Sequence, residues 1–146
     1  MNEIIKNKST GKSWSVLLIE DNENDVFLTE LALKKSNIKY NLDIANNGKT
    51  AIELFNSIIK EEKKPPDLIL LDINLPVING LEVLKYIKSR GEISFIPTVV
   101  FTSSDSDSDI KYCYDNGADL YVNKPNNIND FKEIIQNIKK HCLKSG

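Results

Sequence analysis

Reactive polar side chains lie just after four short apolar runs of this 146-residue sequence: Glu20 and Asp21, then Asp72, Thr102 and, one residue further on, Lys124. Carboxylates brought close together repel one another, and a bound divalent cation removes that repulsion. Mg²⁺ suits oxygen ligands, whereas softer metals prefer His or Cys, which these positions lack. If the fold brings them together, these residues predict a magnesium site flanked by a hydroxyl and an ammonium group.

A carboxylate beside Mg²⁺ can attack phosphorus and form an aspartyl phosphate. The transferring phosphoryl group spreads its charge over its oxygens and therefore needs fixed donors besides the metal. The Lys124 ammonium and the Thr102 hydroxyl are such donors. Each residue taken alone also fits a plainer role. Glu20 and Asp21 could be ordinary acids at a helix N-terminus, and Asp72 could cap a strand.

The apolar runs predict five strands: Val16–Ile19, Leu42–Ala45, Leu68–Leu71, Thr98–Phe101 and Leu120–Val122. The first, third and fourth are nearly unbroken, as expected for strands covered on both faces of a parallel sheet. A helical spacing of apolar residues follows each run, around Leu28, Phe55, Leu84, Cys113 and Ile135. The alternation predicts right-handed crossovers and a doubly wound α/β sheet of five parallel strands. The reactive side chains are then expected to meet at the edge where the strands end, which is where ligands bind.

Composition argues against several kinds of protein. The net charge is −2 and every basic residue except Arg90 is Lys, so the arginine-rich surface of a nucleic-acid-binding protein is missing. No apolar run approaches the roughly 20 residues that cross a bilayer, and the first residues hold no signal-peptide core. Cys113 and Cys142 form no metal-binding or disulfide pattern. We expect a single-domain cytoplasmic protein with no nucleic-acid or membrane partner.

Five motifs in the expected order resemble the receiver domain of two-component response regulators. They are Glu20-Asp21, the segment from Asp72 to Gly80, Ile96-Pro97, Thr102-Ser103 and Lys124-Pro125. The resemblance implies the flavodoxin-like receiver fold with strand order 2-1-3-4-5. We expect a flexible N-terminal segment over residues 1–13 and the receiver domain over residues 14–143. The acidic segment Asp105–Asp109 and the linker Lys60–Pro66 are similar to those of phytochrome-associated and related small single-domain regulators.

The resemblance also implies the chemistry of the site. Asp72 would accept a phosphoryl group from phosphohistidine, and Lys124 would contact the acyl phosphate. The ligands of Mg²⁺ would be Glu20, partly through water, with Asp21, Asp72 and the backbone carbonyl of Asn74.

A switch is implied as well. Thr102 would move toward the phosphoryl group after phosphorylation, and Tyr121 would be the aromatic residue that changes rotamer with it, although Tyr121 also fits a plain packing role. The Lys124–Pro125 peptide bond is expected to be cis. Asn74 and Ser104 occupy the positions that tune how easily water attacks the phosphoryl group.

The implied function is that of a phosphoacceptor in a phosphorelay, which catalyses its own phosphorylation and dephosphorylation and is not otherwise an enzyme. The partners would be a sensor histidine kinase or phosphotransfer protein and an unknown downstream protein. The downstream protein would read a surface formed by the fourth helix, the fifth strand and the fifth helix. A homodimer is an alternative, because a dimer face or a docking face could be formed by Tyr112, Tyr114 and the last helix.

Three other functions fit parts of the sequence. Asp72-Ile73-Asn74 resembles the D-x-D motif of small aspartyl-nucleophile phosphatases, but Asn74 cannot act as a general acid. Flavin binding on the same topology is disfavoured because the acids from Glu20 to Glu23 would repel its phosphate. A receiver-like interaction module that works without phosphorylation would be expected to lack one of the acids or Lys124.

Overall fold

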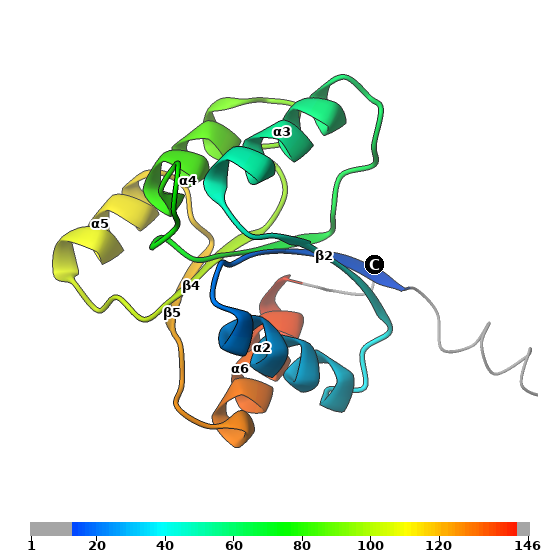
Figure 1. Ribbon diagram of the computed structural model, residues 1–146, viewed down its shortest axis with the longest axis vertical. Helices are drawn as coiled ribbons and strands as arrows, with labels where there is room; N and C mark the ends of the chain where they lie inside the picture. The colour runs from blue at the N-terminus through cyan, green and yellow to red at the C-terminus, as the bar shows by residue number, and fades with distance from the viewer. Residues whose placement is uncertain (1–12, 143–146) are drawn as a thin grey trace, which may run out of the picture.

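The computed structural model describes residues 13–142, which form an open five-stranded sheet with helices on both faces (Figure 1). The strands are β1 (Trp14–Ile19), β2 (Tyr40–Ala45), β3 (Leu68–Leu71), β4 (Thr98–Thr102) and β5 (Leu120–Asn123). All neighbouring pairs are parallel and the order is β2-β1-β3-β4-β5. The predicted doubly wound sheet and its strand order are confirmed, and each strand boundary lies within two residues of the predicted one.

A helix follows each strand. The helices within the described residues are α2 (Glu23–Lys35), α3 (Gly48–Ile59), α4 (Gly80–Ser89), α5 (Asp107–Asp115) and α6 (Ile128–Cys142). Helices α2 and α6 cover one face of the sheet, and α3, α4 and α5 cover the other (Figure 1). Alternate side chains of a strand point to opposite faces, so β1 sends Leu17 and Ile19 into one core and Val16 and Leu18 into the other. Burial on both faces explains why the central strands are unbroken apolar runs.

Polar caps start the helices next to the strand ends. The N-cap side chains of α2 to α5 each accept a hydrogen bond from a backbone N–H three residues later: Asn22, Asn47, Asn79 and Ser106. Such a cap typically contributes about 1 kcal/mol, because it satisfies a donor that the helix itself leaves free. Each of these helices follows a strand along the chain and so begins at the edge of the sheet where the strands end.

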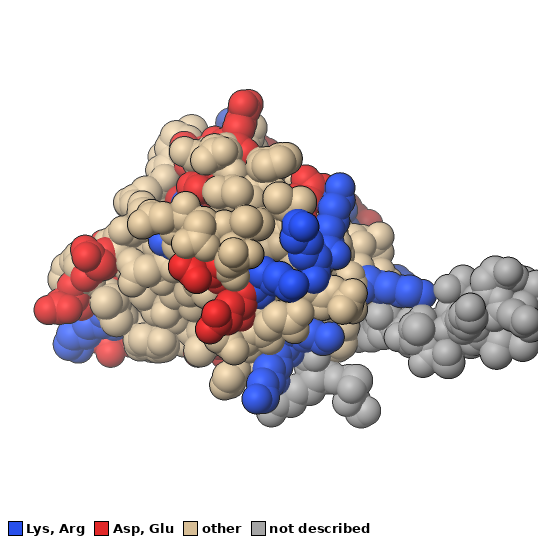
Figure 2. Space-filling model, turned by 90° about the horizontal axis from the view of Figure 1, so that it is seen from below, with Lys and Arg blue, Asp and Glu red and all other residues tan. Residues whose placement is uncertain are grey.

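Charge is separated along the face formed by α2 and α6. Helix α2 carries Glu23 and Asp25 in its first turn and Lys34 and Lys35 in its last, and α6 likewise begins with an acid and ends with bases. Figure 2 looks at the molecule from the side of α2 and α6 and shows several lysines gathered right of centre, with acids at the centre and left. The arrangement complements the helix dipoles and leaves the edge with the strand ends acidic.

Two glycines allow the helices to approach the loop after β3. A Cβ atom on Gly80 would lie 2.2 Å from the backbone oxygen of Asp72 and 2.4 Å from the Cα atom of Ile73. A Cβ atom on Gly48 would lie 1.9 Å from the backbone oxygen of Ile78. These distances are far below van der Waals contact, so both helices start directly against the main chain that follows Asp72.

No helix within residues 13–142 has the length and apolar character needed to cross a membrane. The predicted flexible segment over residues 1–13 lies outside the described residues except for Ser13, and Leu143 at the other predicted boundary lies outside them too.

Replacing Gly80 with Ala is expected to destabilise the protein. The added methyl group would overlap backbone atoms that cannot rotate away, and overpacking of this kind typically costs about 1–3 kcal/mol or more. Urea denaturation would show the loss as a lower midpoint. Gly91→Ala is the matched control, because a Cβ atom on Gly91 meets no atom within 4 Å. Equal midpoints for the two variants would show that the close approach at Gly80 does not matter.

Candidate functional site

Three acidic side chains meet where β1 and β3 end. Glu20 and Asp21 follow β1, and Asp72 follows β3. One carboxylate oxygen from each of the three lies within 4.8 Å of the other two. Glu20 and Asp72 are buried, whereas Asp21 is exposed. The sheet therefore brings together the three acids that the sequence placed at its strand ends.

The ammonium group of Lys124, at the end of β5, lies among these acids. Its Nζ atom is 2.6 Å from Glu20 Oε1, 2.8 Å from Asp72 Oδ2 and 2.9 Å from Asp25 Oδ2. An ammonium has three donors, so each carboxylate can occupy one of them. The Lys124 side chain is only 7% exposed, and a charge so deeply buried is tolerated only with such partners.

Both oxygens of Asp72 are held by donors. Oδ1 accepts hydrogen bonds from the Thr102 hydroxyl at 2.8 Å and from the backbone N–H of Asn74 at 3.0 Å. Oδ2 accepts a hydrogen bond from Lys124. The carboxylate is thus fixed in one orientation by β4, by its own loop and by β5. A fixed carboxylate of this kind is prepared to act as a nucleophile.

The environment shifts the pKa values of the two buried acids in opposite directions. Burial raises the pKa of Glu20 to about 7, and the neighbouring Asp72 charge adds to the effect against the opposing influence of Lys124. Burial also acts against the ionised form of Asp72, but the hydrogen bonds from Lys124, Asn74 and Thr102 outweigh it and lower the pKa of Asp72. Asp72 is therefore the acid that stays ionised.

Burial also opposes the charge on Lys124. Its hydrogen bonds to Asp72, Glu20 and Asp25 outweigh that effect and raise the pKa of the Lys124 ammonium above its usual value. Lys124 is therefore a permanent positive charge within the site at any physiological pH.

The sequence did not identify Asp25 as a member of this site. Asp25 lies in the first turn of α2 and is the third acidic partner of Lys124. The available signal is its spacing, because Asp25 comes four residues after Asp21, in the first turn of the helix that follows the acidic pair. An acid at that position also fits an ordinary helix N-terminus, so spacing alone does not separate the two roles.

The expectation of a cis peptide bond between Lys124 and Pro125 is wrong. No peptide bond within the described residues is cis. Trans is the preferred form even before proline, by about 0.5–1 kcal/mol. The Lys124 side chain reaches the three acids from a trans backbone, so the site does not require the rarer form.

The predicted switch residues form one connected group. The Tyr121 hydroxyl donates a hydrogen bond to the backbone oxygen of Ser104 at 2.7 Å, and the backbone N–H of Ser104 donates to Thr102 Oγ1 at 3.3 Å. Thr102 already donates to Asp72 in this structure. Thr102 therefore already contacts the unmodified carboxylate, and its movement toward a phosphoryl group after phosphorylation stays a prediction.

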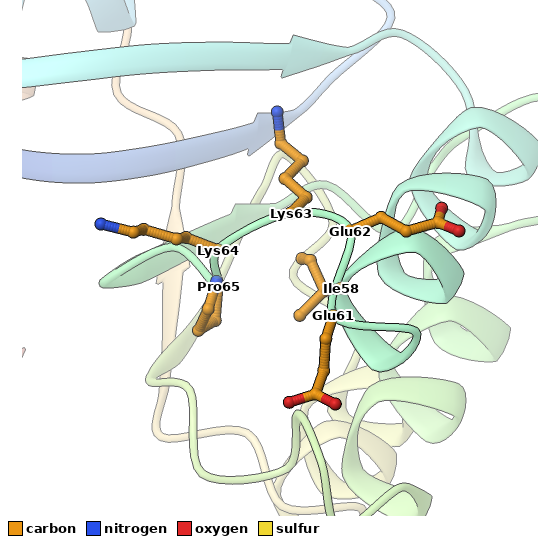
Figure 3. Close-up of a pocket in the computed structure, with 6 residues that line it drawn as sticks. All are labelled: Ile58, Glu61, Glu62, Lys63, Lys64 and Pro65. Atoms are coloured by element: carbon orange, nitrogen blue, oxygen red, sulfur yellow. The ribbon is translucent and has the colours of Figure 1, made fainter.

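A shallow pocket of about 320 Å³ lies at the other edge of the sheet, in the loop between α3 and β3. Its lining includes Ile58, Pro65 and four charged side chains from Glu61 to Lys64. Figure 3 shows these charged side chains pointing in different directions rather than converging. None of the predicted site residues lines this pocket, so the acidic edge of the sheet is the better functional candidate.

The acidic edge has the donor set of a divalent-cation site. Glu20, Asp21 and Asp72 offer carboxylate oxygens close enough to share one ion. Hard cations such as Mg²⁺ and Mn²⁺ prefer oxygen ligands of this kind. Such an ion would also relieve the repulsion among the three acids.

Comparison with known proteins identifies the family. The family model of the response regulator receiver domain matches residues 16–136. The chain belongs to the response regulator receiver family. Receiver domains are the phosphoaccepting modules of two-component phosphorelays and bind a divalent metal, so the sequence-based interpretation of fold and function is confirmed.

Individual relatives agree with this assignment. The response regulator Rcp1 of Synechocystis sp. is 35% identical over 131 residues, which cover 89% of this chain and 89% of that protein. The polar-differentiation response regulator DivK of Brucella anthropi is 34% identical over 122 residues, which cover 84% of this chain and 93% of that protein. The crystal structure of the phosphorylated cyanobacterial phytochrome response regulator RcpA superposes with a TM-score of 0.83 at 32% identity, covering 92% of this chain and 97% of that one. A Mn²⁺-bound form of Rcp1 gives a TM-score of 0.81 at 34% identity, covering 91% and 96%.

Glu20→Gln is expected to stabilise the receiver without metal at high pH. Because the pKa of Glu20 is about 7 in the folded protein and 4.5 ordinarily, the folded state keeps a proton that the unfolded chain has released. The free energy of unfolding therefore falls as the pH rises through this window. Gln removes that loss, which is on the order of 3 kcal/mol at pH 8 and much smaller at pH 5.

Urea denaturation with EDTA at the two pH values measures this effect. Glu23→Gln is the control, because Glu23 is an exposed acid in the first turn of α2. The control is expected to change stability by a similar small amount at both pH values. A Glu20→Gln variant that gains no more at pH 8 than at pH 5 would contradict the proton linkage.

Proposed function

We propose that Asp72 is the phosphoacceptor of this receiver domain and that Lys124 and Thr102 complete its reactive site. The observation that carries the proposal is the fixed, ionised Asp72 carboxylate, with Lys124 on one oxygen and Thr102 and the Asn74 N–H on the other. An oxygen of Asp72 would attack phosphorus while the bond from phosphorus to the donor's histidine nitrogen breaks. The electron pair of that bond leaves with the imidazole, which takes up a proton.

The residues around Asp72 would stabilise the transferring group. Lys124 already lies at hydrogen-bond distance from the carboxylate, so its ammonium is placed to face the negative oxygens of a phosphoryl group. The Thr102 hydroxyl donates to the other oxygen and can turn to a phosphoryl oxygen instead. No large movement of either side chain is needed for these contacts.

Glu20, Asp21, Asp72 and the backbone carbonyl of Asn74 would hold Mg²⁺, which supplies charge neutralisation for the incoming phosphoryl group. The oxygen-only donor set supports this choice of ion. The Mn²⁺-bound form of Rcp1 supports the same kind of hard cation in a relative.

The partners follow from this chemistry. The donor would be a sensor histidine kinase or a phosphotransfer protein, and a downstream protein would read the surface of α5, β5 and α6. Tyr121 links that surface to the site through Ser104 and Thr102, which supports its role as the switch aromatic. We place the protein in the cytoplasm and assign the receiver domain to residues 14–143. The small-phosphatase alternative finds no support, because the Asn74 side chain has no acidic group to protonate a leaving oxygen.

Asp72→Asn is expected to abolish Mg²⁺-dependent labelling of the protein by radiolabelled acetyl phosphate. The amide of Asn is not a nucleophile, although it fills nearly the same space. Asp115→Asn, which changes an exposed acid at the end of α5, is expected to keep full labelling. Labelling that survives in Asp72→Asn, or that needs no divalent cation, would refute the assignment. Multiple turnover of a small phosphate ester would favour a phosphatase instead.

A further inference from the structure

The backbone oxygen of Ser104, in the loop between β4 and α5, accepts two side-chain hydrogen bonds. One donor is the Tyr121 hydroxyl at 2.7 Å, and the other is the Asn123 amide nitrogen at 2.9 Å. A carbonyl oxygen has two lone pairs, so both acceptor positions of Ser104 are used. Tyr121 and Asn123 both belong to β5, the strand beside β4 (Figure 1). The loop after β4 is therefore attached to the neighbouring strand at two points.

The backbone N–H of the same residue, in the preceding peptide group, leads to the reactive carboxylate. The Ser104 N–H donates to Thr102 Oγ1 at 3.3 Å, and that hydroxyl donates to Asp72 Oδ1 at 2.8 Å. Asn123 is also the register partner of Thr102 across the sheet. A continuous chain of hydrogen bonds therefore runs from the Asn123 amide through Ser104 and Thr102 to Asp72.

The Ser104 hydroxyl adds a third attachment. It donates a hydrogen bond to Asp109 Oδ2 at 2.7 Å, in the first turn of α5. The position of the loop is thus tied to β4, to β5 and to α5 at a single residue. Moving Ser104 away from β5 would break the contacts of Tyr121 and Asn123 together.

We propose that Asn123 is a positioning residue that holds the loop after β4 so that the Thr102 hydroxyl stays against Asp72 before phosphorylation. The inference rests on the roles proposed above for Asp72 and Thr102. Asn123 is exposed and belongs to neither core cluster, so packing does not account for its placement. Its amide is the donor that keeps Ser104 in place when the Tyr121 hydroxyl leaves the carbonyl.

The consequence is a receiver whose loop is largely arranged for phosphorylation in the resting state. A hydrogen bond of this kind changes an equilibrium by roughly three- to tenfold. When the Thr102 hydroxyl is already in place, no free energy is spent on ordering it as the phosphoryl group arrives. We therefore expect the position of the loop to affect the rate of phosphorylation.

Asn123→Ala tests the proposal in the unphosphorylated protein. We expect hydrogen exchange at the Ser104 amide to accelerate by roughly three- to tenfold, measured by NMR, while exchange at Val99 and Val100 in β4 stays the same. The rate of labelling by acetyl phosphate with Mg²⁺ is expected to fall by a similar factor. Asn126→Ala, which removes an exposed Asn from the loop after β5, is the matched control and should change neither measurement.

Further variants separate the outcomes. Tyr121→Phe keeps the ring and removes the hydroxyl, and the double variant with Asn123→Ala should raise Ser104 exchange beyond either single change. Unchanged Ser104 exchange in Asn123→Ala overturns the proposal, and faster exchange with an unchanged labelling rate overturns the link from the loop position to the rate of the reaction. Absence of labelling in the unaltered protein instead refutes the phosphoacceptor role, while faster exchange in Asn123→Ala would still establish that Asn123 positions the loop.

Discussion

The structure of the site depends on one buried ammonium among converging carboxylates. Lys124 Nζ lies within 2.9 Å of acids from three separate segments: Glu20 after β1, Asp25 in α2 and Asp72 after β3. Without that positive charge, the parallel sheet would place several negative charges at one edge with nothing to offset their repulsion. The strand order matters for the same reason. Strands β1 and β3 are neighbours, and only β4 separates β3 from β5, so the Lys124 side chain after β5 can extend past β4 to the acids.

The surrounding backbone is shaped to bring helices close to this edge. Gly80 and Gly48 leave no room for a Cβ atom, so α4 and α3 begin directly against the loop that follows Asp72. Val77 in the same loop has a φ of 72°, a left-handed conformation that is unfavourable for a β-branched residue. The loop that follows the proposed acceptor is therefore strained. Such strain persists only where the surrounding structure holds the backbone in place.

The sequence was enough to predict the sheet, its order and most of the site, because each depends on a local pattern. Unbroken runs such as Leu68–Leu71 report burial on both faces, and the residue after such a run must lie at the strand end. Asp25 and Asn123 were missed because their contacts depend on side-chain directions in three dimensions. The cis bond at Pro125 was wrong because it was inferred from the family resemblance, and no local feature of this sequence requires it. Thr102 was placed correctly, but its contact with unmodified Asp72 depends on the loop at Ser104, which no sequence pattern describes.

The surroundings of Glu20 and Asp72 shift the pKa values of these two carboxyl groups in opposite directions. Glu20 is buried and its pKa is raised to about 7, whereas hydrogen bonds lower the pKa of Asp72. A carboxylate nucleophile must be ionised, and the hydrogen bonds to Asp72 keep it so despite its burial. Even beside Lys124, Glu20 becomes fully charged only at higher pH, and a bound divalent cation would favour its charged form further. Separation of pKa values within a pair of acids commonly accompanies a division of roles, and here it supports the nucleophile role proposed for Asp72 beside the hydrogen bonds that fix its carboxylate.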